Sequence, residues 1–442
     1  MATGGKTARK VSAAEAASLV RSGMWLDYGM GLVQPDLFDA AVAARRAELR
    51  DVKFRSCLSL RPRAVLENDP AGDHFLWFSW HFSGYDRKQH DLGRCNYIPM
   101  NFGETPDYYR RFIDPVDIVI LRTAPMDADG YFNFGGAACY SAAVCERAKC
   151  IIVEVTEHAP YVYGTENAVH VSEVDYIIDE GGVPNPEIKN PPASDIDKQI
   201  ARLIAGEIED GACLQIGIGS MPNAVCSLLK ESGVKDLGIH TEMLTDGLID
   251  LYESGIVTGA RKAIDRGKCV FTFAAGSARQ YQAMTRNEEI VARAVDYTNL
   301  PQNIMRNDRV VSINNTTEID LQGQAASECN GHRQISGTGG QLQFVRGAYA
   351  SKGGKSFICL SSTYDKKGER RSRIVLDLTL GNIVTTPRTD VMYVVTEYGL
   401  VNLKGKSVAE RVVALVSIAH PDFREDLLRQ ARDSNMIPKG FA

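Results

Sequence analysis

Long apolar runs and blocks of like charge are both missing from this sequence of 442 residues. No run of about 18 apolar residues occurs, so no membrane-spanning helix is expected. The 50 basic and 55 acidic residues give a net charge of −5 and are spread along the chain, so we expect no nucleic-acid partner. The start of the chain, Met1–Lys10, lacks the apolar core of a secretory signal peptide.

Several motifs of common enzyme classes are missing as well. None of the ten cysteines forms a Cys-x-x-Cys pair, so we expect reduced thiols in a cytoplasmic protein and no metal site. Gly354-Lys355-Ser356 lacks the earlier glycine of a P-loop, and Pro222 stands where a dinucleotide fingerprint beginning at Gly217 needs its third glycine. No Gly-x-Ser-x-Gly elbow lies between a strand and a helix, which argues against a serine hydrolase.

One arrangement of elements is present twice. Each copy has a helix, a strand, a Gly-x-Gly turn with a proline shortly after, and a second helix. The first copy has the strand Met24–Tyr28, the turn Gly29–Pro35 and the helix Asp36–Leu49. The second has the strand Ala212–Ile216, the turn Gly217–Pro222 and the helix Asn223–Leu229. The repeat predicts two similar α/β domains.

The remaining expected strands are continuous apolar runs, as in strands that helices cover on both faces. They are Ile118–Leu121, Cys150–Val155, Val270–Phe273, Val310–Ile313, Phe357–Leu360, Ile374–Leu378 and Met392–Val395. We therefore expect two open, mostly parallel α/β domains, over residues 1–185 and 195–442. The boundary is placed in the segment Gly181–Ser194, which is rich in Gly, Pro and Asn.

The stretch Gly238–Gly247 contains the first candidate for chemistry. It resembles a short buried strand end with Glu242 at its tip, and Thr245 begins a turn or a helix. A glutamate in such a place is costly unless it is paired or used. The alternative is that Glu242 has a structural role.

Glycine-rich turns supply the second group of candidates. Gly217–Met221, between a strand and a helix, can present backbone N–H groups to a phosphate or an oxyanion. The loop Ser336–Gln341 has three glycines in four residues, which allows close approach of the backbone to a ligand. The side-chain amide of Asn299 is a possible donor, although Asn299 taken alone is typical of a turn.

Taken together, these segments resemble the acetyl-CoA hydrolase/transferase family of class I coenzyme A transferases, and most of all the butyryl-CoA:acetate and 4-hydroxybutyrate coenzyme A transferases. The resemblance runs in order along nearly the whole chain. The matching segments are Asp27–Gly29, Ser79–Gly84, Ala124–Asp127, Gly130–Gly135, Cys145–Lys149, Gly217–Ala224, His240–Met243, Gly337–Gln341, Lys352–Phe357, Val395–Gly399 and Ile418–Arg424.

The resemblance implies two similar domains with the active site in the cleft between them. It implies a transferase that exchanges coenzyme A between a short-chain acyl-CoA and acetate through a glutamyl-CoA thioester. The implied catalytic residues are Glu242, Asn299 and Gly340, and the implied coenzyme A-binding residues are Gly217, Ile218, Gly219, Ser220, Met221, Gly339 and Gly340. No permanently bound cofactor and no metal are implied. The implied partners are acyl-CoA, small carboxylates and further copies of the chain, as a homodimer or homotetramer.

Alternatives stay open within this resemblance. Ser220 stands where relatives often carry glycine. Glu328, in Ser327-Glu-Cys-Asn-Gly331, is similar to the catalytic Ser-Glu-Asn-Gly segment of two-subunit transferases and is an alternative nucleophile. Arg61 and Arg63 are either ligands for a dicarboxylate such as succinate or itaconate, or surface and interface arginines. An acyl-CoA hydrolase and a non-catalytic acyl-CoA sensor are the remaining functional alternatives.

Overall fold

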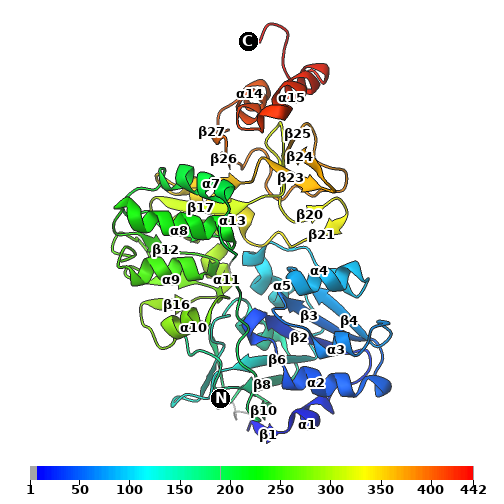
Figure 1. Cartoon of the computed structure of the whole chain (residues 1–442). Coiled ribbons are helices and arrows are strands. Elements are labelled where there is room, and N and C mark those ends of the chain that lie inside the picture. Colours follow the sequence, from blue (N-terminus) through cyan, green and yellow to red (C-terminus); the bar gives the residue numbers. More distant parts are fainter. Residues whose placement is uncertain (1–6, 190, 442) are drawn as a thin grey trace. The chain divides into compact units, whose positions relative to one another are not determined.

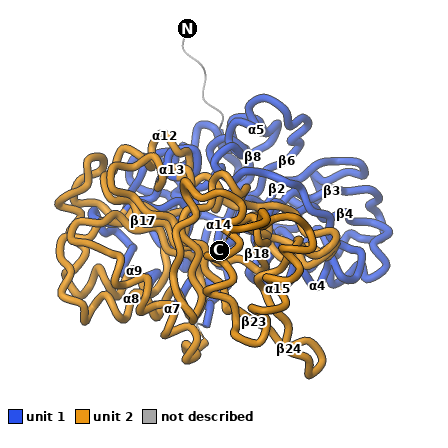
Figure 2. Tube along the Cα trace, turned by 90° about the horizontal axis from the view of Figure 1, so that it is seen from above, with its two compact units in different colours: residues 1–189, 270–298 blue, residues 190–269, 299–442 orange. Residues whose placement is uncertain are grey.

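The computed structural model describes residues 7–189 and 191–441, which form two compact units (Figure 2). Unit 1 contains the described residues up to 189 and residues 270–298, and unit 2 contains the rest. Each unit has a largely parallel sheet with helices, which confirms the predicted α/β class. In the described chain, no helix is long and apolar enough to cross a bilayer. No disulfide joins the ten cysteines, nine of which are buried.

The main sheet of unit 1 has eight strands in the order β1-β10-β8-β6-β2-β3-β4-β5, and every neighbouring pair is parallel (Figure 1). Its strands are β1 (Arg9–Val11), β2 (Trp25–Met30), β3 (Val52–Cys57), β4 (Phe75–Ser79), β5 (Cys95–Tyr97), β6 (Ile118–Thr123), β8 (Ile151–Val155) and β10 (Tyr176–Ile178). The helices are α1 (Ala13–Ala17), α2 (Leu37–Ala44), α3 (Ala64–Glu67), α4 (Gly84–Asp91), α5 (Thr105–Arg111) and α6 (Ser141–Arg147). A separate antiparallel pair consists of β7 (Tyr131–Asn133) and β9 (Ala168–His170).

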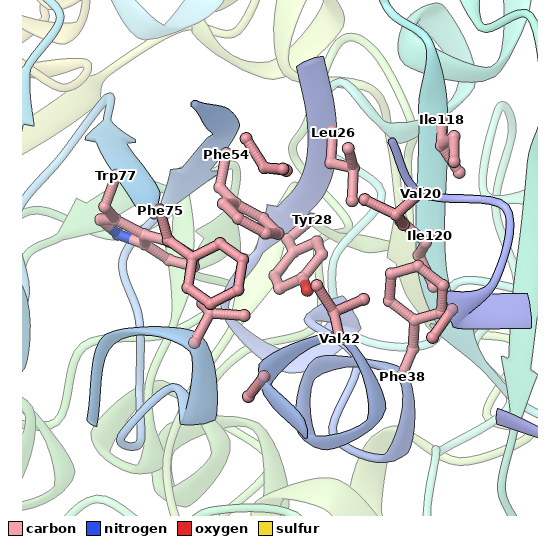
Figure 3. Packing of buried hydrophobic residues seen from close by; sticks show 14 of the residues in the cluster. Val20, Leu26, Tyr28, Phe38, Val42, Phe54, Phe75, Trp77, Ile118 and Ile120 are labelled. Atoms are coloured by element: carbon pink, nitrogen blue, oxygen red, sulfur yellow. The ribbon is translucent and has the colours of Figure 1, made fainter. Parts of the chain in front are cut away.

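Aromatic side chains of the neighbouring strands β2, β3 and β4 form the centre of the unit 1 core (Figure 3). The rings of Phe54 and Trp77 stack with centroids 5.7 Å apart, and Tyr28 meets Phe54 edge-on at 5.1 Å. Phe38 and Val42 of α2 belong to the same buried cluster. Burial of such rings is among the largest apolar contributions to stability, so this cluster fixes α2 against the sheet.

Residues 270–298 belong to unit 1, although the expected domain division placed them in the C-terminal domain. The backbone N–H of Ala274 donates to the carbonyl of Gly136 at 2.7 Å, and the rings of Phe273 and Phe102 lie 6.1 Å apart. The expected strand Val270–Phe273 is split in two. The elements here are β14 (Cys269–Phe271), which begins at the boundary, β15 (Phe273–Ala274), α10 (Ala278–Met284), β16 (Ile290–Ala292) and α11 (Val295–Asn299), which ends at the next boundary.

The main sheet of unit 2 has six strands in the order β12-β11-β17-β22-β26-β27. All neighbours are parallel except β27, which pairs antiparallel with β26. The strands are β11 (Cys213–Ile216), β12 (Gly238–Ile239), β17 (Val310–Asn315), β22 (Lys355–Cys359), β26 (Tyr393–Thr396) and β27 (Gly399–Asn402). The order reverses at β11, because the chain continues to β12 on one side of it and later to β17 on the other. Ligands of such sheets bind outside the carboxyl ends of the strands at this reversal.

Helices and short strands surround the unit 2 sheet. Helices α7 and α8 pack side by side, as do α14 and α15 (Figure 1). The helices are α7 (Asp195–Ala205), α8 (Ser220–Ser232), α9 (Asp246–Glu253), α12 (Pro301–Ile304), α13 (Gln341–Ala350), α14 (Val408–Ser417) and α15 (Pro421–Asp433). The short strands are β13 (Met243–Leu244), β18 (Glu318–Asp320), β19 (Ala325–Ala326), β20 (Cys329–Asn330), β21 (Arg333–Gln334), β23 (Thr363–Lys366), β24 (Glu369–Ser372) and β25 (Ile374–Val375).

Candidate active site

Glu242 lies in unit 2, three residues after the end of the edge strand β12. The buried Lys262 holds this strand end, because its Nζ donates to the carbonyls of Ile239 at 2.9 Å and of Lys268 at 2.7 Å. On the other side, Thr241 Oγ1 donates to the carbonyl of Met243 at 3.0 Å. The backbone on both sides of Glu242 is therefore fixed, as a reacting group requires.

Two donors meet the carboxyl group of Glu242. Asn299 Nδ2 donates to Oε2 at 2.5 Å, and the backbone N–H of Gly340 donates to the same carboxyl. Desolvation raises the pKa of Glu242 to about 7 from an ordinary 4.5, and the hydrogen bonds from Asn299 and Gly340 oppose part of that rise. Glu242 is nevertheless only half-buried. A carboxyl group whose pKa is shifted toward neutrality by its surroundings is a candidate for chemistry.

Gly340 is the N-cap residue of α13, and a side chain does not fit there. A Cβ atom on Gly340 would overlap Glu242 Oε2 and Asn299 Nδ2. The preceding Gly339 has φ +54°, a left-handed conformation that favours glycine. The pair of glycines thus allows the backbone N–H of a helix start to reach a carboxyl group.

Asn299 is fully buried and is the last residue of α11. Its sequence context alone indicated a turn residue, and only the resemblance indicated a role in the site. The structure brings Glu242, Asn299 and Gly340 together from three distant parts of the chain. Their roles in catalysis remain proposals.

The glycine turn after β11 lines a cavity of about 280 Å³ in unit 2. Gly219 has φ +127° and is the N-cap of α8, which therefore begins at Ser220 rather than at the expected Asn223. Ser220 Oγ donates to Asp197 Oδ2 at 2.9 Å. The carboxyl ends of β17 and β22 supply most of the remaining lining: Asn315, Thr316, Thr317, Cys359, Leu360 and Ser361.

Arg373 also lines this cavity, although nothing in its sequence distinguishes it from the charged residues around it. Its Nη1 donates to the carbonyl of Thr317 at 2.8 Å, and its guanidinium lies 4.9 Å from the ring centroid of Tyr364. Its Nε is buried without a hydrogen-bond partner. Burial lowers the pKa of Arg373 below its ordinary value. A half-buried guanidinium on the lining of a cavity can bind an anion.

Arg61 and Arg63 lie in unit 1 and contact an acid of their own unit. Asp36 Oδ1 lies 3.3 Å from Arg61 Nε and 3.2 Å from Arg63 Nη2. Arg63 is 1% exposed and also donates to the carbonyl of Pro35 at 2.7 Å. Arg63 is therefore a buried structural arginine rather than a surface one, and Asp36 already provides these arginines with a carboxylate.

Glu328, the alternative nucleophile, is 4% exposed, and burial raises its pKa above the ordinary value. Its Oε2 accepts a hydrogen bond from Thr338 Oγ1 at 2.8 Å. In the described part of the chain, no group of three or more His, Cys, Asp or Glu side chains is arranged to hold a metal ion.

Comparison with known proteins places the chain in a family. The N-terminal domain model of the acetyl-CoA hydrolase/transferase family matches residues 6–188, and the C-terminal domain model matches residues 276–431. Glu242 and the turn Gly217–Met221 fall between the two matches.

The similarity to individual relatives extends along almost the whole chain. A butyryl-CoA:acetate CoA-transferase of Anaerostipes caccae is 46% identical over 431 residues, 96% of each chain. A 4-hydroxybutyrate coenzyme A transferase of Clostridium kluyveri is 42% identical over 81% of this chain and 82% of its own. The crystal structure of RipA from Yersinia pestis has a TM-score of 0.89 at 39% identity, covering 97% of this chain and 98% of that one. The chain therefore belongs to the acetyl-CoA hydrolase/transferase family.

Proposed function

We propose that the protein is a coenzyme A transferase that moves coenzyme A from a short-chain acyl-CoA, such as butyryl- or 4-hydroxybutyryl-CoA, to acetate. The observation that carries this proposal is the carboxyl of Glu242 between the donors Asn299 and Gly340. The similarity to a butyryl-CoA:acetate CoA-transferase supports the choice of substrates.

In the proposed mechanism the ionised Glu242 attacks the thioester carbonyl. The new carbon–oxygen bond gives a mixed anhydride, and the carbon–sulfur bond breaks to release the coenzyme A thiolate. The thiolate then attacks the glutamyl carbonyl and expels the first carboxylate. Acetate reverses these two steps, so one thioester replaces another and the proton count does not change.

Each attack on the glutamyl carbonyl produces a tetrahedral oxyanion on the side chain of Glu242. Asn299 Nδ2 and the Gly340 N–H already meet this carboxyl and are suitable donors to that oxyanion. Loss of one such donor typically costs about 3 kcal/mol of transition-state stabilisation. The two donors therefore favour the ionised form of Glu242 before the attack and stabilise the oxyanion that forms afterwards.

We assign the cavity at Gly219–Met221 to the coenzyme A chain. It opens beside the carboxyl ends of β17 and β22, next to the strand at which the sheet order reverses. Arg373 supplies the cation that a phosphate group of coenzyme A requires. Binding of this distant part of the substrate can then contribute to catalysis at the thioester.

The test is to trap the intermediate. Enzyme incubated with butyryl-CoA without acetate should gain the mass of coenzyme A on the peptide that contains Glu242, and borohydride should abolish the adduct by reducing the thioester. The matched variant Glu242→Gln should form no adduct and should lose exchange activity. An adduct on another peptide, or none, contradicts the proposal.

A companion assay separates transfer from hydrolysis. Product release that depends on acetate indicates a transferase, whereas release of free coenzyme A at the same rate without acetate indicates a hydrolase. The homodimer or homotetramer and the cytoplasmic location expected from the resemblance remain predictions, to be checked by light scattering and by fractionation.

A further inference from the structure

The loop that presents Gly340 is tied to one short segment, Ser327-Glu328. The backbone carbonyl of Glu328 accepts from the N–H groups of Ile335 at 2.7 Å and of Ser336 at 3.1 Å. At the far end of the loop, Gln341 Nε2 donates to Ser327 Oγ at 2.9 Å. Both ends of the loop are therefore anchored on neighbouring residues.

In the middle of the loop, the carboxyl of Glu328 is a further anchor. Thr338 Oγ1 donates to Glu328 Oε2 at 2.8 Å, and Glu328 is 4% exposed. Thr338 stands two residues before Gly340, and Gly339 between them has a left-handed conformation. Because glycine is conformationally permissive, the direction of the Gly340 N–H depends on what holds its neighbours.

We propose that Glu328 is a positioning residue for the donor at Gly340. By accepting the hydrogen bond of Thr338, its carboxyl holds the loop Gly337–Gly340 so that the Gly340 N–H stays directed at Glu242. This inference rests on the proposed function and adds to it a residue that touches neither substrate nor reacting atoms. It also gives Glu328 a role other than that of nucleophile.

The geometry of the two glutamates supports this difference in role. Glu242 meets a side-chain amide and a backbone N–H, the two kinds of donor that stabilise an oxyanion. Glu328 meets the hydroxyl of the loop that it anchors. A buried carboxyl that accepts a hydrogen bond from a glycine loop restricts the loop.

The test uses two matched pairs of variants. Thr338→Val removes the hydroxyl without changing the shape, and Thr338→Ser keeps it. Glu328→Ala removes the acceptor, and Glu328→Gln keeps an acceptor oxygen but cannot form an acyl or coenzyme A adduct. Should Glu328→Ala fail to fold, the threonine pair still tests the proposal.

Three results are expected. Thr338→Val and Glu328→Ala lower kcat at least about 10-fold, with KM for butyryl-CoA changed less than about twofold, because the loop acts on the reacting carboxyl. The pH midpoint of kcat/KM moves upward in both, because Glu242 loses a donor to its ionised form. Thr338→Ser and Glu328→Gln retain a kcat near that of the wild type. The kcat of the double variant Glu328→Ala/Thr338→Val is no lower than that of the less active single variant, because both changes remove the same hydrogen bond.

Either of two results overturns the inference. One is a Thr338→Val enzyme with the kcat and the pH midpoint of Thr338→Ser. The other is loss of exchange in Glu328→Gln together with a coenzyme A adduct on the peptide of Glu328 in the wild-type enzyme, which would make Glu328 the nucleophile.

The inference and the proposed function fail separately. An adduct on Glu242 with an unchanged Thr338→Val enzyme overturns only the role of Glu328. If no adduct forms on any glutamate, the proposed function fails, and the titration of Glu242 followed by carbon-13 NMR in Thr338→Val and Thr338→Ser still tests the loop. The inference then requires a higher midpoint in Thr338→Val, and equal midpoints overturn it.

Discussion

In the proposed mechanism Glu242 attacks the thioester as a carboxylate, yet desolvation raises its pKa to about 7. We therefore expect kcat/KM for butyryl-CoA to rise with pH to a midpoint near 7 and then level off. Asn299→Ala should move the midpoint to higher pH, because the lost hydrogen bond favoured the carboxylate. Asn299→Asp should move it further, because it adds a like charge. A midpoint that stays the same in all three enzymes would contradict the assignment.

The same pKa predicts a stability effect that needs no activity. The pKa of Glu242 is higher in the folded protein than its ordinary 4.5, so its contribution to stability is complete below pH 4.5 and is lost as the pH rises through about 7. Glu242→Gln cannot ionise and avoids this loss. At about 1.4 kcal/mol per pKa unit, the variant should be roughly 3 kcal/mol more stable than wild type at pH 8.

Thermal or urea unfolding of both proteins between pH 5 and pH 8 measures this difference. It should shrink toward pH 5 and be largest at pH 8. Glu207→Gln is a control, because Glu207 pairs with Lys355 at 2.9 Å on a partly exposed site and should not gain stability as the pH rises. A difference for Glu242→Gln that does not change with pH would show that the carboxyl is not destabilised by burial.

At the residue scale, Glu242 could be singled out from the sequence, but the residues that contact its carboxyl group could not. The strand-like stretch before Glu242 and its cost of burial could be predicted locally. Asn299 lies 57 residues further along the chain, so no local pattern connects it with Glu242. Gly340 could be expected to approach a ligand, but the sequence does not say that its N–H meets this carboxyl. Only the resemblance placed the three residues in one site.

Among the elements, the strand–turn–helix at β11 and α8 belongs to the proposed coenzyme A site, because it lines the cavity together with Arg373. We expect Arg373→Gln to raise KM for butyryl-CoA about 10-fold or more with a smaller effect on kcat, because a phosphate loses its cation. The KM of Arg373→Lys should lie between those of the wild type and Arg373→Gln, because lysine keeps the positive charge. Steady-state kinetics with butyryl-CoA and with the truncated substrate butyryl-pantetheine measures the effect.

The truncated substrate provides the control for this prediction. Butyryl-pantetheine lacks the phosphates of coenzyme A, so Arg373→Gln should leave its KM unchanged. An equal rise in KM for both substrates would mean that Arg373 supports the fold of the cavity through Thr317 and Tyr364 and does not bind the nucleotide end.

Long apolar strands and capped helices could be predicted from the sequence, whereas short pairings could not. Ser12 and Ser407 each stand three residues before a glutamate and form capping boxes, and α1 and α14 begin directly after them. The strands β18 to β21 have only two or three residues each. β18 pairs with β19 and β20 with β21 as antiparallel neighbours in sequence, but strands this short have no alternating pattern that could be recognised. The loop that anchors Gly340 belongs to this unpredictable part.

On the scale of the whole molecule, unit 1 is completed by residues 270–298, which follow the first segment of unit 2 in the sequence. A fragment of residues 1–189 lacks the segment that pairs with Gly136 and packs on Phe102. We expect this fragment to unfold without a sharp transition. Joining residues 270–298 to it through a glycine–serine linker should restore a cooperative transition at higher temperature, measured by circular dichroism. Equal melting of both fragments would show that the segment adds nothing to unit 1.

The division into units could be predicted only in part. The Pro- and Gly-rich segment after residue 180 gave a boundary close to the observed one at 189, because such segments support few contacts. Sequence patterns gave no sign that the chain returns to unit 1 at residue 270, because the contacts that draw it back are tertiary.

The return of the chain to unit 1 affects how the protein can be made. A ribosome that has just released residue 189 has not yet released the last part of unit 1, which ends at residue 298. The first segment of unit 2, residues 190–269, therefore emerges while unit 1 is still incomplete, so the two units cannot mature strictly one after the other. Asn299 is the next residue, so this hydrogen-bond partner of Glu242 emerges directly after the last residue of unit 1.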